Sequence, residues 1–339
     1  MFASVDVGGL NTGCALATRA GNMVAERTIP TQAHEGAQAV LGRIADTINE
    51  MATEAGGHVR ALGVGVPGLA DYHRGRALFL PNLPGHWRDV PVTDVLAARL
   101  RCPAFLLNDA RMAALGELWY GHGRTVKTMV FLTLGTGIGG GVVIDRKLRL
   151  GPLGAAGEIG HQTILPDGPP CGCGNRGCLE ALAGGPALTG EGVRLMTSGQ
   201  APHLRELVAG DAGRITPKNM AQAAAQGDAA VRGAIVRAGR YLGIGIANVI
   251  TVVYPELVVL GAEVAGVGEL LVETIQREVR ERVRMFPIDR VRIETSMLKD
   301  RAALWGGLAL AIARAAKLPG HPESGEHPDA ALTIDCPDR

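Results

Sequence analysis

Three cysteines within eight residues give the strongest chemical signal in the sequence. The segment Cys171-Gly-Cys173-Gly-Asn-Arg-Gly-Cys178 supplies three thiols, and His161 supplies an imidazole nitrogen shortly before it. This donor set fits tetrahedral Zn²⁺ with no coordination position left for water, which is typical of a structural site. Thiolates this close together repel one another unless a cation holds them. The sequence therefore predicts a structural zinc ion, and unrelated buried cysteines are the less favoured interpretation.

Two carboxylates flank the predicted metal site. Glu158 lies three residues before His161, and Glu180 lies two residues after Cys178. A metal ion would fix both carboxylates in space, where they could accept hydrogen bonds from sugar hydroxyls. The alternative is that each is a solvated surface glutamate, which is the commoner environment of this residue type.

Two glycine-rich turns follow strands in the two halves of the chain. The first is Asp6-Val7-Gly8-Gly9, and the second is Gly135-Thr136-Gly137-Ile138-Gly139-Gly140-Gly141. Glycine leaves backbone N–H groups bare, so such turns can face phosphate oxygens. Taken alone, the first would be an ordinary hairpin turn. Together they could hold one nucleoside triphosphate, although neither is a P-loop or a dinucleotide fingerprint.

Asp109 follows Asn108 at the end of an apolar strand and begins a helical pattern. An aspartate in this position could cap the helix or serve as a general base in a cleft. The residue types around it leave both interpretations open.

The elements that would position these residues alternate between strand and helix. We expect strands followed by polar or glycine turns at 2–8, 12–18, 24–29, 61–66, 104–107, 127–134, 142–145 and 257–260. We expect helices at about 35–55, 110–120 and 301–317. This alternation is typical of an α/β fold. The segment 319–339 has no apolar periodicity, and we expect it to be disordered.

Composition limits the possible functions. The chain has 339 residues, and 47% of them are hydrophobic, so it can bury a large core. Its length suggests two domains. Its formal net charge of +1 argues against a general attraction to nucleic acid or anionic lipid. The apolar stretches 244–253 and 304–313 are too short to span a bilayer, and the first residues lack the pattern of a signal peptide. We therefore expect a cytoplasmic protein with no nucleic-acid or membrane partner.

The motifs in their chain order resemble the family named for repressors, open reading frames and kinases (ROK), which includes bacterial glucokinases and N-acetylhexosamine kinases. The resemblance covers almost the whole chain. The blocks that carry it are Asp6-Val-Gly-Gly9, Gly65-Val-Pro-Gly68, Asn82-Leu-Pro-Gly-His-Trp87, Asn108-Asp-Ala110, Gly135-Thr-Gly-Ile-Gly-Gly140, Gly157-Glu-Ile-Gly-His161 and Cys171-Gly-Cys-Gly-Asn-Arg-Gly-Cys-Leu-Glu180.

The resemblance implies a two-lobed actin-like (ribonuclease H-like) fold with an active-site cleft between the lobes. The expected N-terminal lobe is 1–112, with the helix at about 301–317 packing back on it, and the expected C-terminal lobe is 113–300 with the zinc loop. It further implies transfer of the γ-phosphoryl group of ATP to a hydroxyl, with the 6-hydroxyl expected, of a hexose such as glucose or of an N-acetylhexosamine. A homodimer or higher homo-oligomer is the expected assembly.

Residue roles also follow from the resemblance. Asp109 would be the general base, and Mg²⁺ would lie near Asp6. The positions matching the family's sugar-binding set are Asn82, Asn108, Asp109, Glu158, His161 and Glu180. The positions matching its nucleotide-binding set are Asp6, Gly8, Gly9, Gly135, Thr136, Gly137, Gly139 and Gly261. His161 could serve zinc with one ring nitrogen and sugar with the other.

Three departures from the family pattern motivate an alternative, although the kinase motifs survive all three. Leu10 stands where the family usually has a hydroxyl residue, Arg111 stands where it usually has asparagine, and Gly261-Ala262-Glu263 replaces a glycine triplet. These changes allow a catalytically weakened sugar-binding sensor of the same family. A DNA-binding repressor is less favoured, because the first phosphate-loop strand starts at residue 2 and the chain has no basic excess.

Overall fold

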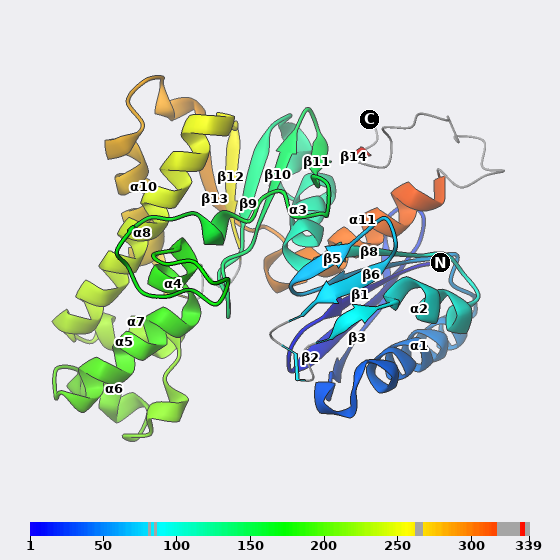
Figure 1. Ribbon diagram of the computed structural model, residues 1–339, viewed down its shortest axis with the longest axis horizontal. Coiled ribbons are helices and arrows are strands. Elements are labelled where there is room, and N and C mark those ends of the chain that lie inside the picture. Colours follow the sequence, from blue (N-terminus) through cyan, green and yellow to red (C-terminus); the bar gives the residue numbers. More distant parts are fainter. Residues whose placement is uncertain (81–82, 85–86, 262–266, 317–332, 336–339) are drawn as a thin grey trace. The chain divides into compact units, whose positions relative to one another are not determined.

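A computed structural model describes residues 1–80, 83–84, 87–261, 267–316 and 333–335 (Figure 1). The chain forms two compact units. Unit 1 contains Met1–Met129, Gly141–Gly157 and Asp300–Arg339, and unit 2 contains Val130–Gly140 and Glu158–Lys299. Each unit is described by itself.

A five-stranded sheet with strand order β3-β2-β1-β4-β8 forms the centre of unit 1. Its strands are β1 (Phe2–Val7), β2 (Asn11–Ala17), β3 (Met23–Pro30), β4 (Ala61–Val66) and β8 (Ala104–Asn108). The first three form the antiparallel meander that the glycine turns predict. β4 runs parallel to both β1 and β8, so the carboxyl ends of these three strands share one edge of the sheet. At this edge Asp6 pairs with Gly65, and Val66 pairs with Asn108.

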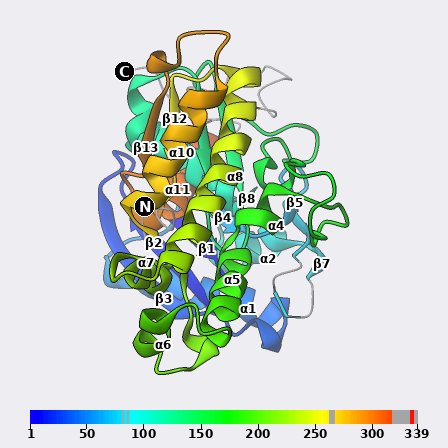
Figure 2. The same ribbon diagram turned by 90° about the vertical axis from the view of Figure 1, so that its left-hand side faces the viewer.

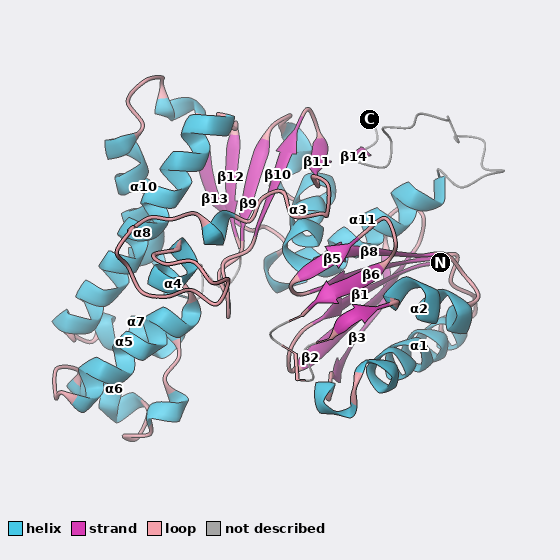
Figure 3. Cartoon of the chain, viewed as in Figure 1, coloured by secondary structure: helices cyan, strands magenta, loops and turns pink. Residues whose placement is uncertain are grey.

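Helices cover both faces of this sheet, with α1 and α2 on one face and α11 on the other (Figure 3). They are α1 (Ala37–Glu54), α2 (Val92–Leu100), α3 (Asp109–Tyr120) and α11 (Ala302–Ala316). α3 and α11 pack closely because glycines face each other's backbone. A Cβ atom on Gly306 would lie 1.6 Å from the carbonyl oxygen of Met112, and one on Gly116 would lie 2.1 Å from that of Ala302. This contact supports the helix that begins at Asp109.

A small antiparallel sheet also belongs to unit 1. It consists of β5 (Leu69–Asp71), β6 (Arg76–Phe79) and β7 (Arg88–Val90). The sequence patterns did not predict these short strands.

The second large sheet has strand order β13-β12-β9-β10-β11-β14. Its strands are β9 (Met129–Leu132), β10 (Gly140–Ile144), β11 (Lys147–Arg149), β12 (Leu257–Leu260), β13 (Arg292–Thr295) and β14 (Thr333–Asp335). The residues of β9 and β12 are buried at every position, which explains their continuous apolar runs. β14 pairs with β11 inside the segment for which the sequence predicted no regular structure.

The helices of unit 2 pack around the long helix α8 (Ala229–Val253), which runs beside α10 (Glu269–Arg282) (Figure 2). The others are α4 (Leu179–Ala183), α5 (Gly185–Thr197), α6 (Pro202–Leu207) and α7 (Pro217–Ala225). By length and composition α8 alone among the described helices could cross a membrane. Its buried residues belong to the hydrophobic core of unit 2, as in the core helix of a soluble protein.

Candidate functional site

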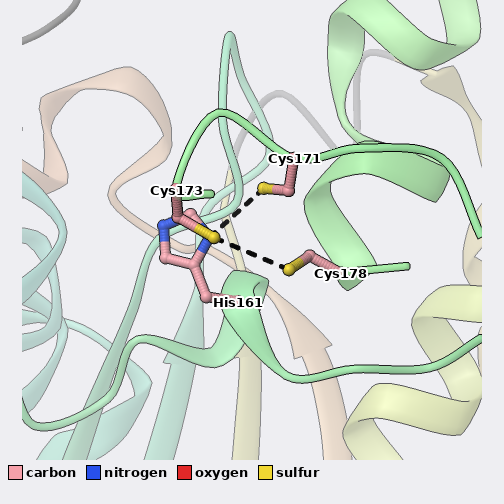
Figure 4. Close-up of side chains that lie close together, drawn as sticks. All are labelled: His161, Cys171, Cys173 and Cys178. Atoms are coloured by element: carbon pink, nitrogen blue, oxygen red, sulfur yellow. Dashed lines mark hydrogen bonds between the residues drawn. The ribbon is translucent and has the colours of Figure 1, made fainter. Parts of the chain in front are cut away.

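The four predicted metal ligands come together in unit 2 (Figure 4). Their donor atoms all lie within 4.8 Å of one another. Sγ of Cys171 is 3.7 Å from Nδ1 of His161, and Sγ of Cys173 is 3.8 Å from Sγ of Cys178. Ligands about 2.0–2.3 Å from a tetrahedral zinc ion lie about 3.3–3.8 Å from one another. The donor set and its spacing therefore fit a zinc ion.

The glycines between the cysteines shape this loop. Gly174 and Gly177 have φ angles of 92° and 63°, in the left-handed region that favours glycine. A Cβ atom on Gly177 would also lie 1.6 Å from the carbonyl oxygen of Leu165. The backbone N–H of Cys171 donates to the carbonyl oxygen of Asn175, which closes the turn that carries the first two thiols. We call residues 171–178 the zinc loop.

The two ring nitrogens of His161 face different neighbours. Nδ1 faces the thiols, whereas Nε2 lies 3.8 Å from Oε2 of Glu158. Glu158 is exposed, and the His161 side chain is one-third exposed. The imidazole can therefore bind metal on one side and present its other nitrogen, together with the Glu158 carboxylate, to a ligand.

Glu180 connects the zinc loop to the second glycine loop, which we define as residues 135–141. Its Oε2 accepts a hydrogen bond of 2.9 Å from the backbone N–H of Ile138. Its Oε1 lies 4.0 Å from Sγ of Cys171. The carboxylate also occupies the space beside Gly137, where a Cβ atom would lie 2.4 Å from Oε2. The interpretation of Glu180 as a solvated surface residue is therefore wrong.

The second glycine loop keeps some backbone donors free. The N–H of Gly135 donates to the carbonyl oxygen of Gly137, and that of Ile138 donates to Glu180. Within the described part of the chain, the N–H groups of Thr136 and Gly137 donate to no acceptor. These two donors can bind an anionic oxygen, as a phosphate loop requires.

A cavity of about 510 Å³ opens beside this loop in unit 2. Gly135 and Thr136 line it together with apolar side chains that include Leu188, Leu242 and Leu271. Among the described residues of its lining, Lys218 has the one charged side chain. An apolar cavity of this size, with glycine-loop backbone and a cation at its boundary, suits a nucleotide. Gly261, which follows β12, donates its N–H to the carbonyl oxygen of Leu132, just before this loop.

The first glycine loop, residues 8–11 of unit 1, is braced by the chain that follows β3. The N–H of Gly8 donates to Asn11, so this donor is not available to a phosphate group, contrary to our expectation. Thr31 donates its N–H to the carbonyl oxygen of Leu10 and its hydroxyl to that of Gly8, each at 2.8 Å. Its hydroxyl then accepts from the Thr12 hydroxyl at 2.9 Å. The sequence did not identify Thr31.

Asp6 and Asp109 lie at the shared edge of the sheet in unit 1. Burial, together with the neighbouring negative charge of Asp109, raises the pKa of Asp6 to about 7. Two neighbouring carboxylates resist ionising together, and a divalent cation relieves their repulsion. This pair therefore fits a magnesium ion.

Asn108 is the N-cap of α3, so the capping role falls to it and not to Asp109. Its Oδ1 accepts hydrogen bonds from the backbone N–H groups of Ala110 and Arg111, and its Nδ2 donates to the carbonyl oxygen of Gly68 at 3.0 Å. One N–H of this amide is left for a ligand. Asn108 can therefore donate to a sugar hydroxyl beside Asp109.

Arg111 is almost completely buried, with 1% of its surface exposed. Its guanidinium group donates to Oδ1 of Asn108 and to the carbonyl oxygens of Ala155 and Ala156, at 3.0–3.1 Å. The departure from the family's asparagine is thus a structural link between α3 and the segment before Gly157. Leu10, the other described departure, is 85% exposed.

Two of the predicted positions cannot be placed. Asn82, the remaining sugar-binding prediction, and Ala262-Glu263, the altered glycine triplet, lie outside the described residues.

Comparison with known proteins agrees with the family resemblance of the sequence motifs. A sequence profile described as "ROK family" matches residues 2–314. The chain is 34% identical over 316 residues to a glucokinase of Halalkalibacterium halodurans, covering 90% of this chain and 93% of that protein. It is 35% identical over 254 residues to a xylose repressor of Caldicellulosiruptor bescii, covering 75% of this chain but only 63% of the repressor.

A solved structure shows the same fold. The ROK family glucokinase of Streptomyces griseus, determined in complex with glucose and AMPPNP, has a TM-score of 0.78 at 32% identity. The match covers 91% of this chain and 98% of that one.

Proposed function

The chain belongs to the ROK family, and from this premise we propose that it is an ATP-dependent kinase that phosphorylates a hexose or an N-acetylhexosamine. The predicted α/β fold of the actin-like type is confirmed by the likeness to the glucokinase structure. The observation that carries the proposal is the cavity of unit 2, because its lining combines an apolar chamber, the backbone of Gly135 and Thr136 from the second glycine loop, and the side chain of Lys218. The AMPPNP in the glucokinase complex supports ATP as its ligand.

The carboxylates of unit 1 would perform the chemistry. Asp109 would accept the proton of the attacking sugar hydroxyl, which we take to be the 6-hydroxyl, while Asn108 would donate a hydrogen bond to the same sugar. Asp6 would hold Mg²⁺, which when bound would supply positive charge to neutralise the phosphoryl group. Asp6, Gly9, Thr136, Gly137 and Gly139 would hold the nucleotide.

The zinc loop would serve the sugar side of the reaction. We propose that His161, Cys171, Cys173 and Cys178 hold a structural zinc ion that orients Glu158, His161 and Glu180 toward sugar hydroxyls. A cytoplasmic location, expected from the sequence, remains part of the proposal, as does a homodimer or higher homo-oligomer, expected from the family resemblance.

Replacing the base tests the catalytic assignment. Asp109→Asn should lower turnover by about 10²–10⁴-fold, which is the usual contribution of a general base, while sugar affinity stays within about twofold. Asp46→Asn, on the exposed face of α1, is the matched control and should behave as wild type. Normal phosphorylation by Asp109→Asn would refute the assignment.

A second candidate is a sugar-binding sensor with weakened catalysis, which the similarity to the xylose repressor favours. A coupled ADP-release assay across hexoses and N-acetylhexosamines separates the two. Turnover with one of these sugars supports the kinase, and measurable sugar binding without any turnover supports the sensor.

A further inference from the structure

We propose that the zinc cluster also holds the second glycine loop in its nucleotide-binding conformation, so that zinc occupancy controls nucleotide affinity as well as sugar affinity. This inference rests on the proposed function, because it takes residues 135–141 as the phosphate loop. All the contacts that carry it lie within unit 2.

Ile138, at the centre of the loop, packs on one side against Gly160. Gly160 immediately precedes His161, and its backbone packs directly on that of Ile138. A Cβ atom on Gly160 would lie 2.0 Å from the carbonyl oxygen of Ile138 and 2.8 Å from its Cβ. No side chain fits between them, so the position of the loop follows that of the His161 backbone.

Glu180 holds Ile138 on the other side. Its carboxylate accepts the Ile138 N–H at 2.9 Å. Glu180 lies in the first turn of α4, whose N-cap residue is the metal ligand Cys178. Two residues after this short helix, the N–H of Gly185, the first residue of α5, donates to the carbonyl oxygen of Gly135 at 2.9 Å. Glu180 in α4 and Gly185 just after it are therefore both hydrogen-bonded to the glycine loop.

These contacts make Glu180 and Gly160 positioning residues for the phosphate-binding backbone. Each lies within two residues of a metal ligand, and Ile138 between them is 2% exposed. Four ligands on one ion fix the backbone at His161 and at Cys178 relative to each other. Loss of the ion frees these two segments, and the N–H groups of Thr136 and Gly137 then lose their fixed direction.

The first experiment removes zinc from the wild-type chain by chelation and measures the affinity for a fluorescent ATP analogue. Elemental analysis determines the zinc content, and circular dichroism shows whether the chain stays folded. We expect the affinity to fall at least about tenfold, equivalent to about 1.4 kcal/mol, and to recover when zinc is restored. Unchanged affinity in the zinc-free, folded chain would overturn the inference.

The second experiment keeps the metal and breaks the contact. Gly160→Ala should still bind about one zinc ion per chain but bind the analogue at least about tenfold more weakly, because its Cβ displaces Ile138. The matched control is Gly172→Ala in the zinc loop, where an added Cβ meets nothing within 4 Å. Equal affinities of the two zinc-loaded variants would overturn the inference even if the zinc-free chain does not fold. Failure of the zinc-loaded wild type to bind any ATP analogue would instead refute the proposed function.

Discussion

Asp6→Asn should stabilise the protein at neutral pH while abolishing the proposed kinase activity. Raising the pKa of this carboxyl from its ordinary value of 3.8 to about 7 corresponds to about 4 kcal/mol between its two protonation states. The side chain keeps partial contact with solvent, which screens the effect, so we expect roughly 2 kcal/mol.

The sign of the pH dependence follows from proton binding. Below about pH 4 the carboxyl is protonated in both the folded and the unfolded chain. Between about pH 4 and pH 7 the unfolded chain loses this proton and the folded chain keeps it, so wild-type stability falls as pH rises. The asparagine variant lacks this loss. Its free energy of unfolding relative to wild type should therefore increase by roughly 1–2 kcal/mol from pH 5 to pH 8.

Urea unfolding at pH 5 and pH 8, in magnesium-free buffer without chelator so that zinc is retained, measures this difference. Asp46→Asn is the control, because that carboxylate is exposed. Added Mg²⁺ should stabilise the wild type at pH 8 and leave Asp6→Asn unaffected. An equal effect of Asp6→Asn at both pH values would refute the electrostatic reasoning.

Three further substitutions test the supporting contacts. Cys173→Ser should lower the zinc content below about one ion per chain and lower the melting temperature, whereas Cys102→Ser, in the core of unit 1, should leave the zinc content unchanged; full zinc retention by Cys173→Ser would contradict the ligand assignment. Arg111→Met should lower the free energy of unfolding by about 3 kcal/mol, because it leaves two carbonyls without their charged donor. The control is Arg60→Met at an exposed position, and an equally small effect of Arg111→Met would show that these hydrogen bonds contribute little to stability. Thr31→Val should raise the KM for ATP about tenfold with a smaller change for sugar, and equal changes for both substrates would argue against a specific effect on the first glycine loop.

The sequence predicted the parts of the fold with strong local signals. The strands at 2–8, 61–66 and 257–260 and the helix at 110–120 are confirmed, because apolar runs and glycine turns marked them. The strands β5–β7, three or four residues each, were missed, because such segments are too short to show a periodicity. β14 was missed because its pairing with β11 joins distant parts of the chain.

The sequence identified residues of the candidate site by their types but did not predict the contacts between them. The spacing of the thiols identified the metal ligands, which the structure brings together. The bond from Ile138 to Glu180 and the brace at Thr31 depend on tertiary packing, and neither has a local signature. Arg111 was singled out only as a departure, since two of its acceptors, the carbonyl oxygens of Ala155 and Ala156, lie 44 and 45 residues further along the chain.

The packing of α11 against α3 has a consequence for how the protein is made. Residues 1–129 leave the ribosome first, but the helix that completes their core begins at Ala302, after all of unit 2. At about 5–20 residues per second, the roughly 170 intervening residues take about 10–35 s to synthesise. During that interval the surface that will receive α11 is exposed on the nascent chain, including the buried faces of β1 and β4. Unit 2 can therefore finish folding while the earlier-synthesised unit still waits for its last helix, and this is the period in which a chaperone would be most needed.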